Sequence, residues 1–179
     1  MPRYLAIIAL LVSLSVPTQF ALAEAIKTKH FIFHVEQGSE RNTARLAANA
    51  EKRLSVLCNM LEVCDAVGDV PIQVWLAPDA ERFAAAFGHP TPMAEWAVGV
   101  TFVGQGKIVL RAHGSALFTL EETFDHELSH ELLYRAVGVR GVPRWFGEGV
   151  AIWQAGEAVL KRLVPAQQAA MTGNLKPLD

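Results

Sequence analysis

The segment from Thr119 to Gly138 constrains the fold of this 179-residue chain more than any other. Thr119 followed by Glu122 is a capping-box pattern, which begins a helix, and glycine commonly ends one, as Gly138 would here. Apolar residues recur between these ends at helical spacing: Phe124, Leu128, Leu132 and Val137. The sequence therefore predicts one helix over residues 119–137.

His126, Glu127 and His130 of this helix form an HExxH motif. Residues four apart lie about 40° apart around a helix and about 6 Å along it, so two imidazoles can bind one ion. Glu127 is displaced sideways, where it can act as general base on a water molecule beside the metal. Zinc accepts histidine nitrogen and carboxylate oxygen ligands. We therefore expect one zinc ion per chain, with His126 and His130 as ligands and Glu127 as the catalytic residue.

A third metal ligand is sought after the motif, where the chain has no further histidine or cysteine. The metzincin pattern needs Gly at position 133 and His at position 136, and the residues there are Leu133 and Ala136, which excludes that class. The acidic residues that follow the motif are Glu131, Glu148, Glu157 and Asp179.

Glu148 is the acid that a helical hairpin brings back to the histidines. The chain would run about 10 Å past His130 to Gly138 and return about 8 Å from Pro143, which can begin a second helix, to Glu148. Of the other acids, Glu131 adjoins His130 and faces away from the metal. Glu157 would overshoot the metal by more than two helical turns, and Asp179 is the last residue of the sequence. We therefore predict Glu148 as the third ligand.

The two motifs together carry a family resemblance. HELSH at residues 126–130 and PRWFGEGVA at residues 143–151 resemble the gluzincin-type zinc metallopeptidases, and within them the peptidase MA-like domain family, whose motifs read HELxH and PxWxxEGxA. The resemblance covers most of residues 28–155. It implies a zincin-like domain that cleaves peptides or proteins, with zinc on His126, His130 and Glu148 and with Glu127 activating water.

Many gluzincins also supply a tyrosine or histidine that stabilises the oxyanion, usually after the ligands. The one tyrosine beyond residue 23 is Tyr134, on the motif helix, and no later histidine follows. Arg111 or His113, from the preceding strands, is a further candidate for this role.

Residues 1–23 have the layout of a cleaved secretory signal. Arg3 precedes an apolar run from Leu5 to Val16, and Ala21-Leu22-Ala23 fits signal peptidase. A retained anchor is the alternative, but a run of about 12 residues is short of the ~20 that cross a bilayer. We expect a secreted or periplasmic protein without stable membrane insertion, and a single peptidase MA-like domain over residues 24–179 that is short at its C-terminus.

Export also bears on Cys58 and Cys64, the two cysteines of the chain, because an oxidising compartment favours a disulfide. Six residues of continuous helix rise about 9 Å, and a disulfide needs Cα atoms within ~7 Å. A bridge therefore requires the helix to end between them. Two buried thiols are the alternative, and zinc ligation by the pair is less favoured still.

The rest of the chain predicts an α+β fold. Alternation over residues 31–35 and an apolar run over 70–76 predict strands, and residues 97–103 and 107–111 flank a glycine turn as a hairpin does. Helices are expected over residues 39–61 and 79–87. The prediction is a small mixed or antiparallel sheet of about four strands, followed by the helical hairpin that carries the motifs.

Composition limits the partners. The chain is 51% apolar and 19% charged with a formal net charge of −2, which indicates a globular domain and no nucleic-acid partner. A peptide substrate could instead pair with the edge of the predicted hairpin, provided that this edge is exposed near the metal.

Other side chains receive ordinary roles. His30 and His34 share one face of a strand, where solvation is favoured over a second metal site. His89 is expected in an exposed loop, and Trp96 could line a cleft. Three aromatic residues at helical spacing are expected in the core rather than as a substrate platform: Trp145, Phe146 and Trp153.

The leading hypothesis is an exported zinc metallopeptidase that uses Glu127 as general base. The alternatives are a catalytically silent, peptidase-like binding module and a member of the family that is incomplete at its C-terminus.

Overall fold

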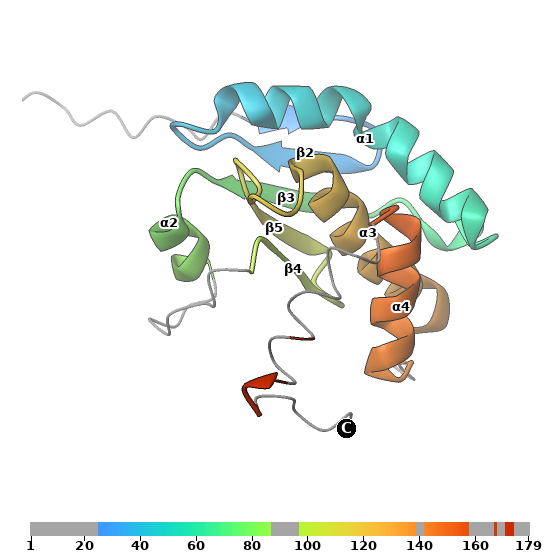
Figure 1. Ribbon diagram of the computed structural model, residues 1–179. Helices are drawn as coiled ribbons and strands as arrows, with labels where there is room; N and C mark the ends of the chain where they lie inside the picture. The colour runs from blue at the N-terminus through green and yellow to red at the C-terminus, as the bar shows by residue number, and fades with distance from the viewer. Residues whose placement is uncertain (1–24, 87–96, 139–141, 158–166, 168–170, 174–179) are drawn as a thin grey trace, which may run out of the picture.

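The computed structural model describes residues 25–86, 97–138, 142–157, 167 and 171–173. Its five strands form one sheet in the order β1-β2-β3-β5-β4 (Figure 1). The strands are β1 (Ala25–Lys27), β2 (Phe31–His34), β3 (Ile72–Ala77), β4 (Gly99–Phe102) and β5 (Lys107–Arg111). The helices are α1 (Glu40–Met60), the 3₁₀ turn η1 (Cys64–Ala66), α2 (Ala80–Ala85), α3 (Leu120–Val137) and α4 (Arg144–Gln154). This mixture of sheet and helices confirms the α+β class.

The sheet is mixed in direction. β2, β3 and β5 are parallel, while β1 and β4 pair antiparallel at the two edges. The predicted hairpin is confirmed as β4 and β5, and its turn has Gly104 and Gly106 at φ of 79° and 59°, where side chains are disfavoured. The sequence prediction missed β1, because three residues are too short to show an alternating pattern.

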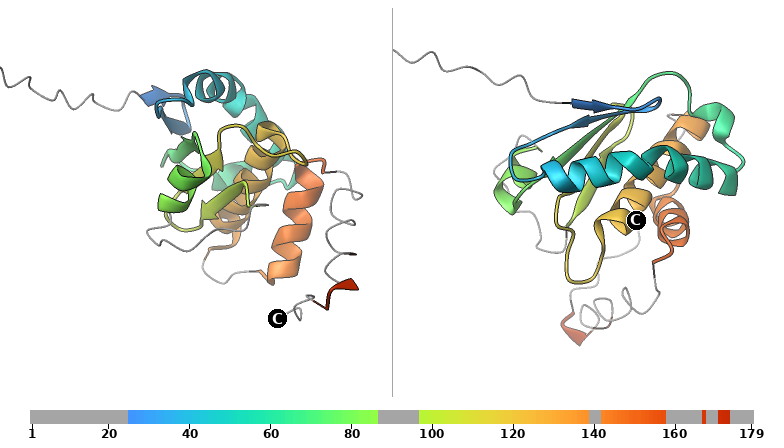
Figure 2. Two further views of the ribbon diagram at one scale, coloured as in Figure 1. Left: turned by 60° about the vertical axis from the view of Figure 1, so that its left-hand side comes forward. Right: turned by 90° about the horizontal axis from the view of Figure 1, so that it is seen from above.

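The two faces of the sheet pack against different helices. Alternate residues of β2, β3 and β5 join α1 and α3 in the main core, among them Phe31, Val74 and Leu110. Val109 faces the other way and packs with Phe83 of α2. Figures 1 and 2 show α2 and α4 on opposite sides of the molecule. Both motif helices therefore lie away from the α2 face.

The predicted disulfide is confirmed. Cys58 lies in the last turn of α1 and bonds to Cys64 in η1, with their Cα atoms 4.7 Å apart. The helix ends at Met60, between the two cysteines, as the bridge requires.

The ends of the motif helices follow the local signals. Thr119 and Glu122 form the capping box at the start of α3, and Gly138 ends that helix at φ 67°. α4 begins directly after Pro143. Within the described part of the chain, no helix combines the length and the apolar character that crossing a membrane requires. Residues 1–23 lie outside that part.

Candidate metal centre

The centre is built on one face of α3. His126 and His130 lie one turn apart, and their Nε2 atoms approach to 3.2 Å. The rings stand nearly perpendicular, at 78°, with their centroids 4.9 Å apart. Two nitrogens with lone pairs or protons aimed at the same point repel unless a proton or a cation lies between them. The two imidazoles are therefore placed to share one proton or one cation.

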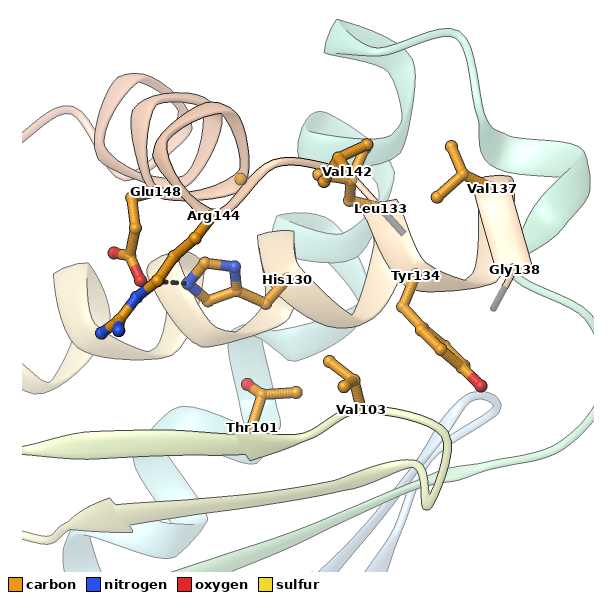
Figure 3. Close-up of a pocket in the computed structure, with 11 residues that line it drawn as sticks. Thr101, Val103, His130, Leu133, Tyr134, Val137, Gly138, Val142, Arg144 and Glu148 are labelled. Atoms are coloured by element: carbon orange, nitrogen blue, oxygen red, sulfur yellow. Dashed lines mark ion pairs between the residues drawn. The ribbon is translucent and has the colours of Figure 1, made fainter. Parts of the chain in front are cut away.

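Glu148 completes a group of three. It reaches the centre from the second turn of α4, with Oε2 3.5 Å from His126 Nε2 and Oε1 3.9 Å from His130 Nε2. Figure 3 shows its carboxylate directed at the His130 ring across the space between the two helices. The sequence prediction of a returning helical hairpin thus brings these three side chains together.

The group has the dimensions of a metal site. One possible ligand atom from each residue lies within 4.8 Å of the other two. Ligand atoms at about 2.0–2.2 Å from a tetrahedral zinc ion lie about 3.4 Å from one another. The two nitrogens lie 3.2 Å apart, and Glu148 approaches each of them with a different oxygen, at 3.5 and 3.9 Å, so the group is close to that spacing. The cluster could bind a metal ion, and its geometry alone does not select the metal.

Electrostatics also favour a cation here. Burial lowers the pKa of His126, but hydrogen bonds to Glu148 and Glu157 outweigh burial and raise it to about 9. Burial and the charge of His126 lower the pKa of His130. The hydrogen bond from His126 lowers the pKa of Glu148 against an opposing effect of burial. One positive charge therefore sits between two acids and a neutral imidazole, where a metal could replace it.

Glu157 contacts the candidate centre in a way that the sequence analysis did not predict. It is buried, and its Oε1 lies 2.9 Å from His126 Nδ1. An ionised carboxylate can only accept a hydrogen bond, so the Nδ1 atom of His126 carries the hydrogen. The Nε2 atom of His126 then faces the candidate metal position. The prediction that Glu157 overshoots the centre assumed a continuous helix. In the structure α4 ends at Gln154, and Gly156, at φ 65°, turns the chain back.

Glu127 lies beside the ligands rather than among them. Its side chain is buried, and its Oε2 lies 2.7 Å from the Thr101 hydroxyl on β4. The same hydroxyl lies 2.8 Å from the Glu127 carbonyl oxygen. A hydroxyl has one hydrogen to donate, so it holds the backbone and the carboxylate of Glu127 alternately. β4 therefore fixes the position of the expected general base.

Gly99 makes this contact between strand and helix possible. A Cβ at this position would lie 2.7 Å from Thr123 Cγ2 and 2.8 Å from both Cγ and Oε1 of Glu127. These distances are shorter than van der Waals contact, so a side chain at position 99 would clash with Thr123 and Glu127. A glycine is needed here for space rather than for an unusual φ.

A buried amide fastens α4 to the rest of the core. Ser129 donates a hydrogen bond of 2.6 Å to Gln154 Oε1, and Gln154 Nε2 donates one of 2.8 Å to the Leu57 carbonyl oxygen. These bonds link α3, α4 and α1. They fix the far end of the helix that carries Glu148.

The other acids of the motif helix are engaged elsewhere. Glu131 accepts a 2.8 Å bond from Arg135, whose guanidinium also reaches the Val67 and Val70 carbonyl oxygens. Asp125 pairs with Arg53 of α1 at 2.5 Å. Arg135 thereby ties α3 to the segment before β3, and Asp125 ties it to α1.

Neither upstream candidate for the oxyanion role is directed to the centre. Arg111 belongs with Val109 on the α2 face of the sheet, because side chains alternate along β5. His113 follows β5 and lies 3.4 Å from the Asn42 amide at the start of α1. Arg144, one turn before Glu148 on α4, lies closer, and its charge contributes to the lowered pKa of that carboxyl.

The remaining candidates are distributed over the surface. His30 bonds to Glu51 at 2.7 Å, whereas His34 stacks on Trp75 with ring centroids 4.0 Å apart, so the two do not form a common site. His89, Trp96 and Asp179 lie outside the described residues.

The expectation of buried aromatic residues on α4 is wrong. Trp145 and Trp153 are 65% and 58% exposed, and Phe146 is 40% exposed. The helix turns its glycine side toward α3, where Gly147 would carry a Cβ 3.9 Å from His130 Nδ1. This close approach leaves the aromatic side chains outside the core.

Comparison of the chain with protein-family models, with curated proteins and with solved structures finds no match in any of the three.

Proposed function

We propose that this chain is an exported, zinc-dependent metallopeptidase of gluzincin type. One observation carries the proposal: His126, His130 and Glu148 converge within 4.8 Å of one another, while Glu127 lies buried on the same helix as the two histidines. Three residues would bind the metal, while Glu127 would stay off the metal and act as general base. Metal-assisted hydrolysis requires both.

Zinc fits the donor set of two imidazoles and one carboxylate. Three protein ligands leave a fourth position of a tetrahedral ion for water or substrate. A zinc ion bound there would supply a water of lowered pKa and polarise a carbonyl group. Magnesium and calcium prefer oxygen ligands and fit the two histidines poorly.

Glu127 would accept the proton of the attacking water and pass it to the leaving amine. Its carboxylate is held at 2.7 Å by Thr101, so it does not rotate freely when the proton moves. The hydrogen bond that His126 Nδ1 donates to Glu157 similarly fixes the imidazole ring. Both contacts support a preorganised site.

β4 supports the choice of a peptide as substrate. The Arg111 amide donates to the Val98 carbonyl oxygen, so in an antiparallel ladder the backbone groups of Val98 and Val100 face β5. Those of Gly99 and Thr101 face the edge, where no described strand pairs. An extended peptide could pair with these groups directly beside Glu127.

The disulfide supports export. The Cys58–Cys64 bond is stable in an oxidising compartment such as the periplasm or the extracellular space, and it is rare in the cytosol. It agrees with the signal sequence expected over residues 1–23.

The test is Glu127→Gln, assayed against a mixed peptide library with zinc content measured on the same preparation. We expect the wild type to cleave, and the variant to retain zinc while losing at least about a hundredfold in kcat, since general-base catalysis contributes 10²–10⁴-fold. Glu81→Gln, an exposed acid on α2, is the matched control and should leave both quantities unchanged. Zinc binding without cleavage by the wild type would instead support the silent binding module.

A further inference from the structure

A cavity of about 330 Å³ opens directly beside the metal centre. His130 and Glu148 form one end of it, and Thr101, which holds Glu127, lines its floor. Figure 3 shows these side chains facing a common space between β4, α3 and the start of α4. A molecule bound at the centre would therefore contact this cavity.

The end of the cavity away from the metal centre is aliphatic. Three separate segments contribute four side chains to it: Val103, Leu133, Val137 and Val142. Val103 and Val137 are 51% and 39% exposed although they line the cavity. Exposed apolar surface inside a concavity gains free energy when a ligand covers it.

The size of the cavity suits a large side chain. A cavity of about 150 Å³ lined by apolar side chains holds a benzene ring. The present one has about twice that volume, so a phenyl or branched aliphatic group fits with room for its backbone. The charged lining residues, Arg144 and Glu148, lie on α4, and Tyr134 is the polar residue among the aliphatic ones.

The position of the cavity along β4 determines which substrate residue enters it. Gly99 lies against Thr123 and Glu127, whereas Gly104 lies against Tyr134, so β4 and α3 run in the same direction. The cavity includes Val103 and Val137 and thus lies at the C-terminal ends of both elements. A peptide antiparallel to β4, the commoner pairing, would bring its amino-terminal part there.

We infer that this cavity binds a large apolar side chain of the residue on the amino-terminal side of the scissile bond. That the bound molecule is a peptide substrate rests on the proposed function. The position and lining of the cavity do not depend on it. It assigns substrate selection to four aliphatic residues that neither bind the metal nor transfer a proton.

Two N-acetylated hydroxamates test this inference without turnover. A hydroxamate binds zinc in place of the scissile carbonyl, so the side chain of N-acetyl-phenylalanine hydroxamate would enter the cavity, and N-acetylglycine hydroxamate has none. On the zinc-loaded full chain, calorimetry should give at least about tenfold tighter binding for the phenylalanine compound, because filling an apolar pocket contributes tenfold or more. Equal affinity for the two, or binding of neither, overturns the inference.

Val137→Phe would fill the cavity with the new phenyl ring. Val137 is partly exposed, so the change does not enlarge a side chain of the buried core. It should abolish the tenfold preference and leave the affinity for N-acetylglycine hydroxamate within about twofold. Val56→Phe is the matched control, since Val56 is 51% exposed on α1, and it should keep the preference. An unchanged preference in Val137→Phe also overturns the inference.

Peptide cleavage separates this inference from the proposed function. If the wild type cleaves no peptide but shows the tenfold preference, the hydrolase proposal fails and the pocket inference stands. If it cleaves peptides with equal rates for glycine and phenylalanine before the scissile bond, the pocket inference fails and the hydrolase proposal stands.

Discussion

The Nδ1 atom of His126 lies 2.9 Å from Oε1 of Glu157, a residue 31 positions later in the chain. Such a carboxylate fixes the tautomer of a ligand histidine and raises its basicity. The pair joins the motif helix to the segment after α4, so the ligand geometry depends on a contact outside both sequence motifs.

Glu157→Gln should weaken zinc binding by about 10–100-fold, the usual effect of losing such a partner of a ligand histidine. The amide keeps the shape but removes the charge that favours a donating Nδ1. Chelator competition at fixed pH measures the change. Glu81→Gln serves again as control, and equal zinc affinity of Glu157→Gln and wild type would show that the contact has no role in binding.

Zinc affinity should rise with pH from 6 to 8. The pKa of His126 is raised to about 9 in the metal-free protein, so this imidazole is protonated at neutral pH and must lose a proton before it can bind. Release of one proton predicts about tenfold tighter binding per pH unit below the pKa. Calorimetry in two buffers of different ionisation enthalpy measures the released proton, and a pH-independent affinity would contradict the assignment.

Gly99→Ala should lower both stability and cleavage. The added Cβ would lie 2.8 Å from Glu127 Oε1, so β4 and the base must move apart. Overpacking of this kind costs about 1–3 kcal/mol of the free energy of unfolding. The control is Gly149→Ala, where no atom lies within 4 Å of the new Cβ, and which should not destabilise α4. Urea unfolding and kcat measurements on both variants provide the comparison.

Replacing both Cys58 and Cys64 by Ala should reduce the free energy of unfolding by about 2–3 kcal/mol, the loop-closure entropy of so short a loop. Zinc affinity should remain within about threefold, because the bridge joins α1 to η1 and contributes no ligand. Urea denaturation of the oxidised protein and of the double variant measures the difference. A loss of zinc binding in a variant that remains folded would contradict this separation.

Sequence patterns predicted those parts of the site that local rules determine. The HExxH spacing, the capping box at Thr119 and the stop at Gly138 each depend on neighbours within one or two helical turns. The return of Glu148 needed a single assumption about hairpin length, and the disulfide needed one about where α1 ends.

The missed features depend on long-range packing. Glu157 reaches His126 because Gly156 reverses the direction of the chain. The sequence shows that a glycine is present there but not that its φ is positive. The exposure of Trp145 follows from which side of α4 meets α3, and helical spacing gives no rule for that choice. Arg111 lies on the α2 face because side chains alternate along β5. Which of the two alternating sets faces the main core depends on how β5 pairs with β3 and β4.

Thr101 joins two tasks that are usually assigned to different residues. Its amide and carbonyl face the outer border of the sheet, while its hydroxyl holds Glu127. If Glu127 is the proton acceptor of the proposed hydrolysis, a guest strand docking on that border would contact the residue that holds this acceptor in place. Under the proposed function, recognition of a ligand and readiness for chemistry would be coupled through this one short side chain.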